Sequence, residues 1–113
     1  IMNLHDEFEL AEQFIREQLT FNKDVSVSFF ETVIRCVGAM VAMYDLTGNA
    51  LYLNHLRTLM DNLLPAFKTE PLGFPATDIN LLKGNISISN CDGSCVVLAD
   101  IASIQLEFNA ACD

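Results

Sequence analysis

The chain has 113 residues, of which 51% are hydrophobic, and its 15 acidic against 6 basic residues give a formal net charge of -9 at pH 7. This apolar content excludes a disordered chain, because disordered segments are poor in apolar residues. The acidic balance, with no basic stripe, excludes nucleic-acid binding, which requires lysine and arginine against phosphates.

The first predicted element is an amphipathic helix over residues 4–19. Apolar side chains recur there at helical spacing, at Leu4, Phe8, Ala11, Ile15 and Leu19. Glutamates and an arginine occupy the positions between them. This periodicity predicts one buried face and one face in water.

The second predicted helix, over residues 26–46, is apolar nearly all the way round, which indicates the interior of a larger helical assembly. Glu31, Arg35 and Asp45 interrupt the run. Since a helix that crosses a bilayer needs about 20 nearly uncharged residues, we predict no membrane-spanning segment. Gly48 is expected to end this helix, and Asn49 is expected to cap the next one.

A third helix is predicted over residues 50–67, and a fourth over residues 96–112 with Ser94 as its cap. The connection between them, residues 68–94, is rich in proline, glycine, asparagine and serine. Loops of this length usually carry function or disorder. The expectation is therefore an all-α chain of about four helices and one long loop, with no confident strand. Composition alone also fits helical hairpins of the kind used for protein interaction.

The four cysteines leave the redox compartment open. Cys36 is expected to be a packed thiol in a helix, whereas Cys91 and Cys95 flank a turn sequence that can bring them together. The pairing among these three and Cys112 stays open. A metal site is less favoured, since no second Cys or His pair has matching spacing. Residues 85–87, Asn-Ile-Ser, form an N-glycosylation sequon in a polar loop, which adds slightly to the case for a secretory location.

Glu31 and Arg35 are the informative polar pair, because they lie four residues apart on an otherwise apolar helix and leave from the same face. One interpretation is a self-satisfied ion pair. The other is a carboxyl at the floor of a cavity, with its protonation tuned by burial, beside a cation that orients a polar ligand. His5, His55, Met40 and Met43 are expected to have no chemical role, and Glu107 is interpreted as a surface or supporting carboxylate.

Residues 28–38, S-F-F-E-T-V-I-R-C-V-G, followed by Y-D-L-T-G at 44–48, resemble the F-E-x-x-I-R-x-x-G-G signature of glycoside hydrolase family 47, the class I α-1,2-mannosidases. Further segments are similar to motifs of this family in the same order: I-M-N-L with D-E-F at 1–8, L-L-P-A-F at 63–67, G-F-P at 73–75, I-N-L at 79–81, L-A-D at 98–100 and Q-L-E-F at 105–108. The resemblance extends over essentially the whole chain.

The resemblance implies an (α/α)7 barrel of helical hairpins, of which residues 1–113 form the front part of one catalytic domain with no internal boundary. It implies removal of α-1,2-linked mannose from high-mannose N-glycans with inversion, in the lumen of the endoplasmic reticulum or Golgi, with calcium expected for the complete domain. No calcium ligand is assignable in this chain. The partners expected are the glycan or glycoprotein and the remaining helices of the domain.

The resemblance also gives individual residues a role. Glu31 is the candidate general acid, whereas Arg35 and Asp100 are candidate substrate-binding residues. An inverting glycosidase needs a second carboxyl as base, and the family's base lies beyond residue 113, so we expect this chain to be inactive alone. Asp100 stands where the family has glutamate and is one methylene shorter. The alternatives are a non-catalytic mannosidase-like module that binds glycans or proteins, and a plain helical interaction module.

Overall fold

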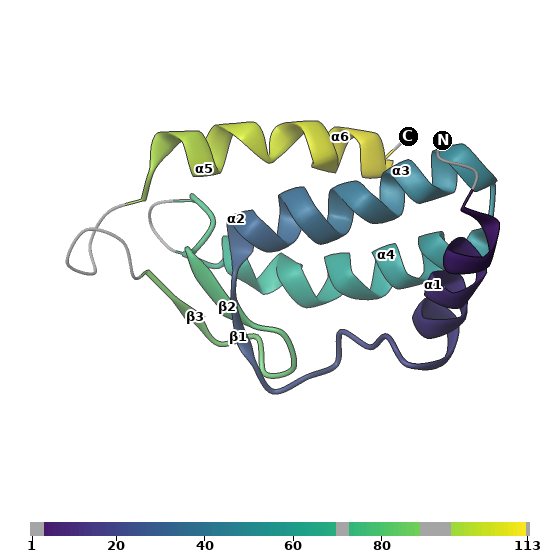
Figure 1. Cartoon of the computed structure of the whole chain (residues 1–113). Helices are drawn as coiled ribbons and strands as arrows, with labels where there is room; N and C mark the ends of the chain where they lie inside the picture. The colour runs from purple at the N-terminus through teal and green to yellow at the C-terminus, as the bar shows by residue number, and fades with distance from the viewer. Residues whose placement is uncertain (1–3, 70–72, 89–95, 113) are drawn as a thin grey trace.

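The computed structural model describes residues 4–69, 73–88 and 96–112. Its helical elements are α1 (His5–Glu17), α2 (Phe29–Thr32), the π-helical η1 (Val33–Val37), α3 (Gly38–Thr47), α4 (Ala50–Leu63), the 3-10 helix η2 (Leu64–Phe67), α5 (Leu98–Ser103) and α6 (Gln105–Cys112). Its strands are β1 (Ser26–Ser28), β2 (Asp78–Asn80) and β3 (Ile86–Ser87). The mainly helical architecture expected from the sequence is confirmed (Figure 1).

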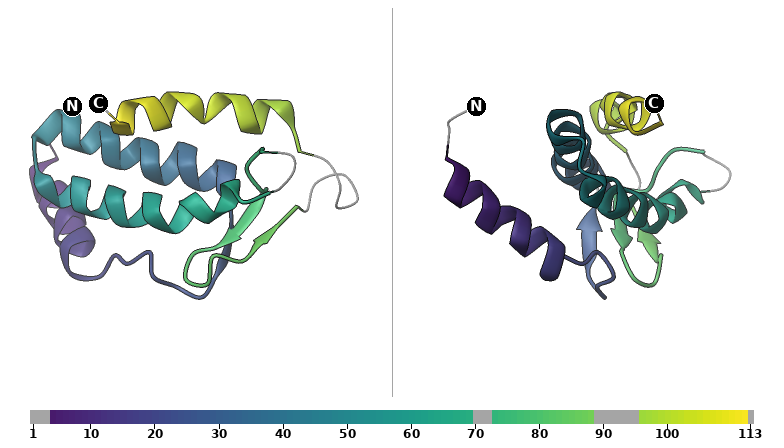
Figure 2. Two further views of the ribbon diagram at one scale, coloured as in Figure 1. Left: turned by 180° about the vertical axis from the view of Figure 1, so that it is seen from behind. Right: turned by 90° about the vertical axis from the view of Figure 1, so that its right-hand side faces the viewer.

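The centre of the fold is an antiparallel helical hairpin. Elements α2, η1 and α3 follow one another without a break and lie beside α4 in both orientations of the molecule (Figures 1 and 2). Gly48 adopts a left-handed conformation, with φ 67°, and its N–H donates to the carbonyl of Tyr44. Asn49 Oδ1 then accepts from the N–H of Leu51 and caps α4. Both predicted boundaries are confirmed.

The core lies between the two arms of this hairpin. Its fully buried side chains come from helical positions three or four residues apart, which share a face: Phe29, Val33, Val37 and Met40 on one arm, and Tyr52, Leu56, Leu59 and Leu63 on the other. Met40 is a core residue and Met43 packs against the core, as expected. At the far end of the second helix, however, Leu46 is 69% exposed, so that helix is not interior along its whole length.

A small antiparallel sheet in the order β1-β2-β3 closes one end of the hairpin (Figure 1). It corrects two predictions: residues 26–28 form a strand rather than the start of a helix, and the long connection contributes β2 and β3. Ile79 explains why these short strands pair. It lies opposite Val27 on one side and Ile86 on the other, and its side chain is fully buried against the helices.

Helices α5 and α6 lie along the central hairpin on the opposite side from β1–β3 (Figure 1). The predicted fourth helix is confirmed over residues 98–112, with a break at Ile104, whose side chain is buried in the core. The predicted cap, Ser94, lies outside the described residues, and Val97 holds the N-cap position of α5. Phe108 joins α6 to Phe29 and Phe67, with ring centroids 6.3 Å and 5.8 Å away.

Helix α1 stands away from the rest of the bundle when the molecule is viewed end-on (Figure 2). The prediction that its apolar face is buried is wrong: no residue of α1 is buried, and Phe8 and Phe14 are exposed. Only Ile15 of this helix, together with Leu19 just beyond its end, packs against the core. Within the part of the chain that the structure describes, no element covers the remainder of this face.

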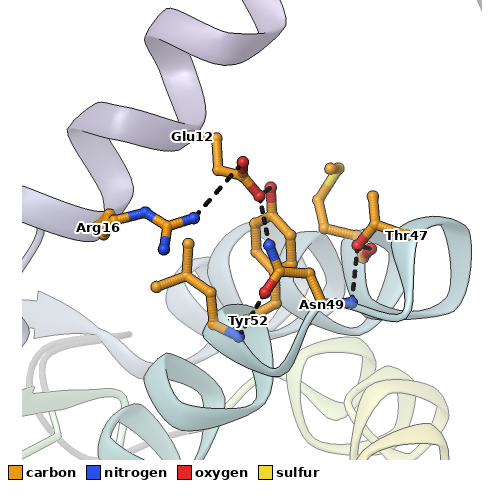
Figure 3. Close-up of polar contacts among 7 residues, drawn as sticks. Glu12, Arg16, Thr47, Asn49 and Tyr52 are labelled. Atoms are coloured by element: carbon orange, nitrogen blue, oxygen red, sulfur yellow. Dashed lines mark hydrogen bonds and ion pairs between the residues drawn. The ribbon is translucent and has the colours of Figure 1, made fainter.

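A polar cluster holds α1 against the turn between α3 and α4 (Figure 3). Glu12 Oε1 accepts from Asn49 Nδ2 at 2.5 Å and from the Tyr52 hydroxyl at 3.5 Å, and Glu12 Oε2 lies 3.7 Å from a guanidinium nitrogen of Arg16. Asn49, which caps α4, is thus also the residue that binds α1 through Glu12.

Among the described residues, no helix has the length and hydropathy that a bilayer crossing requires.

Candidate functional site

The strand-to-helix junction at Ser28 positions Glu31. Ser28 Oγ accepts from the backbone N–H of Glu31 at 3.3 Å, and the Thr32 hydroxyl donates to the Ser28 carbonyl at 2.7 Å. Ser28 and Glu31 have the spacing of an N-terminal capping box. The junction therefore fixes the point from which the Glu31 side chain departs.

The Glu31 carboxylate pairs with Arg35, whose Nε donates to Glu31 Oε2. The predicted pair is present, and among the described residues its two side chains are not buried. The Glu31 side chain is 47% exposed and the Arg35 side chain 74% exposed. Water therefore reaches both groups, and the ion pair itself contributes little to stability.

Arg35 occupies the middle of the π-helical turn η1. Runs of i→i+5 hydrogen bonds inside an α-helix are rare and occur often at functional sites. The core side chains Val33 and Val37 flank Arg35 and are fully buried. The wide turn is thus fixed on its core side and presents Arg35 to solvent on the other.

A pocket of about 270 Å³ opens beside Glu31. Its polar lining includes three carboxylates, those of Glu31, Asp78 and Asp100, which come from α2, β2 and α5. Its apolar lining includes Phe30, Pro75 and Ile101. The fold therefore brings together Glu31 and Asp100, two of the three residues selected from the sequence, whereas Arg35 does not line the pocket and meets it only through Glu31.

Asp78 is the pocket carboxylate that sequence reasoning missed. It lies directly opposite Ser28 in the β1–β2 pair, and Thr77 Oγ1 donates to Asp78 Oδ2 at 3.0 Å. Asp78 stands in a segment that was expected to be loop, so nothing local marked it as a neighbour of Glu31. The alternation Asp78-Ile79-Asn80, with an apolar residue between polar ones, is the one signal of a strand there.

Glu107, interpreted from the sequence as a supporting carboxylate, lies on α6 against η1 and α3. A Cβ placed on Gly38 would lie 3.5 Å from Glu107 Cγ, an ordinary van der Waals distance, so the Glu107 side chain packs directly beside Gly38. Glu107 Oε2 is buried, and it has no hydrogen-bond partner among the described residues. Glu107 does not line the pocket beside Glu31.

Among the described residues, no cysteine or histidine lines this pocket. Cys36 and Cys112 are free thiols. Burial raises the pKa of the Cys36 thiol, which agrees with the packed thiol expected at this position. Cys91 and Cys95, and with them the turn predicted to join them, lie outside the described residues. His55 packs edge-on against Phe21, with ring centroids 6.2 Å apart.

No metal site is formed by the described residues: nowhere in 4–69, 73–88 or 96–112 do three His, Cys, Asp or Glu side chains come together to hold an ion. Calcium takes six to eight oxygen ligands. The carboxylates of this pocket do not supply such a set, so no chemical step is assigned to a metal here.

Comparison with known proteins decides the family. The family model described as glycosyl hydrolase family 47 matches residues 1–111. The chain belongs to glycosyl hydrolase family 47.

Individual members of family 47 are similar over almost all of this chain. It is 41% identical over 111 residues to mannosyl-oligosaccharide 1,2-alpha-mannosidase MNS1 of Arabidopsis thaliana, a match that covers 97% of this chain and 20% of that protein. It is 37% identical to the human endoplasmic reticulum mannosyl-oligosaccharide 1,2-alpha-mannosidase, covering 96% of this chain and 15% of that protein. Mouse mannosyl-oligosaccharide 1,2-alpha-mannosidase IB is also 37% identical, with 96% and 17% covered. The chain thus spans a fifth or less of the length of these family 47 relatives.

Proposed function

We propose that this chain forms one wall of the active site of an inverting α-1,2-mannosidase that trims high-mannose N-glycans. The observation that carries the proposal is the pocket shared by Glu31 and Asp100. These residues are far apart in the sequence, and the family resemblance gives both of them a role independently of the pocket. The names of the similar proteins, all 1,2-alpha-mannosidases, support the reaction and the linkage.

Glu31 is the proton donor in this proposal. Inverting glycosidases protonate the leaving oxygen with one carboxyl group while a second carboxylate activates water on the opposite face of the sugar. Because the Glu31 side chain is half-exposed, we propose that it donates the proton through a water molecule. Arg35 holds the carboxyl in place through its ion pair and presents a cation to the ligand from outside the pocket.

The rest of the pocket suits a sugar ring. Asp78 and Asp100 carry acceptors for sugar hydroxyl groups, and hydrogen bonds to ionised carboxylates are stronger than those between neutral groups. Phe30, Pro75 and Ile101 offer an apolar surface to the C–H face of the ring. A few polar groups set in an apolar lining is the usual composition of a small-ligand site.

The base of the reaction is the part that this pocket lacks. We propose that residues 1–113 act as part of one larger family 47 domain, whose further helices complete an (α/α)7 barrel and supply the second carboxylate and the calcium site. The relatives are at least five times longer than the stretch they share with this chain, which supports this proposal. The name of the human relative, which includes the endoplasmic reticulum, supports our proposal of a secretory location in the endoplasmic reticulum or Golgi.

The test compares the 113-residue chain with the longest protein that contains it, on a high-mannose glycan with terminal α-1,2-linked mannose. We expect the short chain to release no mannose, because an acid without a base completes half of the mechanism. The longer protein is expected to release mannose, with a large loss of kcat on Glu31→Gln and no loss on the control Glu7→Gln, which changes an exposed carboxylate of α1. Turnover by the 113-residue chain that Glu31→Gln abolishes would contradict the partial-site proposal.

A non-catalytic glycan-binding module is the second candidate, and Asp100 favours it. Shortening a substrate-binding side chain by one methylene group moves its carboxylate away from the sugar and weakens the positioning of the substrate. The rate of catalysis depends steeply on that positioning. In this case the longer protein binds mannose-rich glycans on an array without hydrolysing them, and Arg35→Ala weakens that binding. Asp100→Glu separates the two candidates: restored hydrolysis identifies a weakened enzyme, whereas unchanged inactivity identifies a binding module.

A further inference from the structure

The only Asn-x-Ser/Thr tripeptide of the sequence, residues 85–87, begins at the residue before β3 and continues into this outer strand of the sheet. Ile86 is half-buried and pairs with Ile79, whereas Asn85 and Ser87 are both exposed. Side chains alternate between the two faces of a strand. The backbone therefore turns the middle residue of the tripeptide toward the core and its two functional residues together toward solvent.

The hairpin that presents Asn85 is well fixed. Asn80 Oδ1 accepts from the backbone N–H groups of Leu82 and Lys83, and the N–H of Asn80 donates to the Asn85 carbonyl at 2.8 Å. Gly84 turns the chain with φ 67°. The Lys83 ammonium, 2.6 Å from Asp24 Oδ2, ties the turn to the segment before β1. The acceptor asparagine thus lies directly after Gly84, between the turn and β3, and the turn between β2 and β3 can be followed in Figure 1.

We propose that Asn85 carries an N-linked oligosaccharide. The donor is a lipid-linked oligosaccharide diphosphate: a bond forms between Asn85 Nδ2 and C1 of the first sugar, the bond from C1 to the diphosphate oxygen breaks, and the lipid diphosphate leaves. The amide nitrogen loses one proton to the transferase, and no oxidant or reductant is required. Ser87 supplies the hydroxyl that makes the tripeptide an acceptor.

The position of the glycan has a physical effect on the sheet. β3 is an edge strand, and edge strands offer unpaired backbone groups to other chains unless a bulky or charged group blocks them. A glycan on Asn85 would shield the outer side of β3. The attachment point lies two residues nearer the turn than Ser87, which pairs with the pocket residue Asp78. This inference needs the secretory location of the proposed function but not its mannosidase activity.

The experiment expresses the chain behind a secretion signal in eukaryotic cells and compares its gel mobility before and after treatment with peptide N-glycosidase F. We expect one enzyme-sensitive shift, lost in Asn85→Gln and in Ser87→Ala and retained in the matched variant Ser87→Thr. The same glycosidase converts a glycosylated asparagine to aspartate, so peptide mass spectrometry identifies residue 85 directly. Unchanged circular dichroism of Asn85→Gln shows that the variant still folds.

Gln18→Asn provides the control, because it makes residues 18–20 a second sequon just after α1 and leaves the contacts of the Asn85 hairpin unchanged. A glycan on residue 18 in that variant with none on Asn85 overturns the proposal. Absence of any glycan from the secreted chain also overturns it, since the proposal requires Asn85 to be an acceptor in the unaltered sequence. Neither result depends on hydrolysis of mannosides, so the glycosylation proposal and the proposed enzymatic function can be contradicted independently of each other.

Discussion

Ser28 and Asp78 lie directly opposite each other in the antiparallel pair of β1 and β2. Ser28 also accepts a hydrogen bond from the N–H of Glu31, and all three residues line the same pocket. One register of two three-residue strands thus sets both the start of the helix that carries Glu31 and the position of a second carboxylate beside it. A one-residue slip would turn Ile79 out of the core and Asp78 into it, which the buried sheet face does not permit.

Removing the cap tests this arrangement. Ser28→Ala deletes the oxygen that accepts from the Glu31 N–H, and loss of such a cap costs about 1 kcal/mol of folding free energy. We expect that decrease in urea unfolding. Ser26→Ala is the matched control, because Ser26 is exposed on the same strand and precedes the helix by three residues. Equal effects of the two substitutions would show that Ser28 does not cap the helix in solution.

The attachment of α1 depends on Glu12. Glu12→Ala removes the acceptor shared by Asn49 and Tyr52, and net losses for such hydrogen bonds are about 1 kcal/mol each. Since no residue of α1 is buried, we expect faster hydrogen exchange over residues 5–17 with little change in α4. Glu9→Ala, an exposed change on the same helix, serves as the control. Faster exchange spread evenly over the whole chain would mean that Glu12 supports the fold rather than the attachment of α1.

The core between α3 and α4 gives the largest expected loss of stability. Leu59 is fully buried, and truncation of a buried leucine to alanine costs about 2–5 kcal/mol. Leu59→Ala should therefore lower the free energy of unfolding by several times as much as Leu46→Ala, whose side chain is 69% exposed. Similar effects of the two substitutions in thermal or urea unfolding would contradict the packing described here.

The raised pKa of Tyr52 predicts that the protein loses stability at alkaline pH. Burial raises the pKa of Tyr52 above its ordinary value of 10.0, and the nearby Glu12 carboxylate adds to the shift. The phenol therefore ionises at a lower pH in the unfolded chain than in the folded one. Its contribution to the free energy of unfolding is full below about pH 10 and is lost as the pH rises through the folded-state pKa. We expect Tyr52→Phe to flatten this part of the pH dependence, measured as free energy of unfolding, and Tyr44→Phe to leave it unchanged. Identical slopes for the two variants would refute the assignment.

Local signals made part of the fold predictable from the sequence. The end of α3 and the start of α4 follow from Gly48 and Asn49, whose conformational preferences act within one turn. The amphipathic spacing of the third predicted helix likewise indicates the burial of Leu56, Leu59 and Leu63. Leu64 and Phe67, expected on the same face, are exposed. These features need no knowledge of distant residues.

The features that were missed depend on pairing between segments far apart in the chain. Two- and three-residue strands carry too few side chains to show a period, so β1 was interpreted as helix and β2 as loop. Asp78 can be assigned to the pocket only when its strand register with Ser28 is known. The exposure of Glu31 and of α1 depends on which elements cover them, and periodicity alone does not report this. Glu31 and Asp100 were found through a resemblance rather than through periodicity, and their roles stay predictions.

The π-helical turn between Thr32 and Gly38 contains one residue more than an α-helix needs for the same rotation, because its hydrogen bonds run from i to i+5 instead of from i to i+4. Deleting one residue within Val33–Val37 would therefore allow an unbroken α-helix in which Glu31 keeps nearly its present direction. The helix would shorten by about 1.5 Å, the rise of one residue. The deletion would remove the wide turn that carries Arg35 and leave the carboxylate on the side of Asp100.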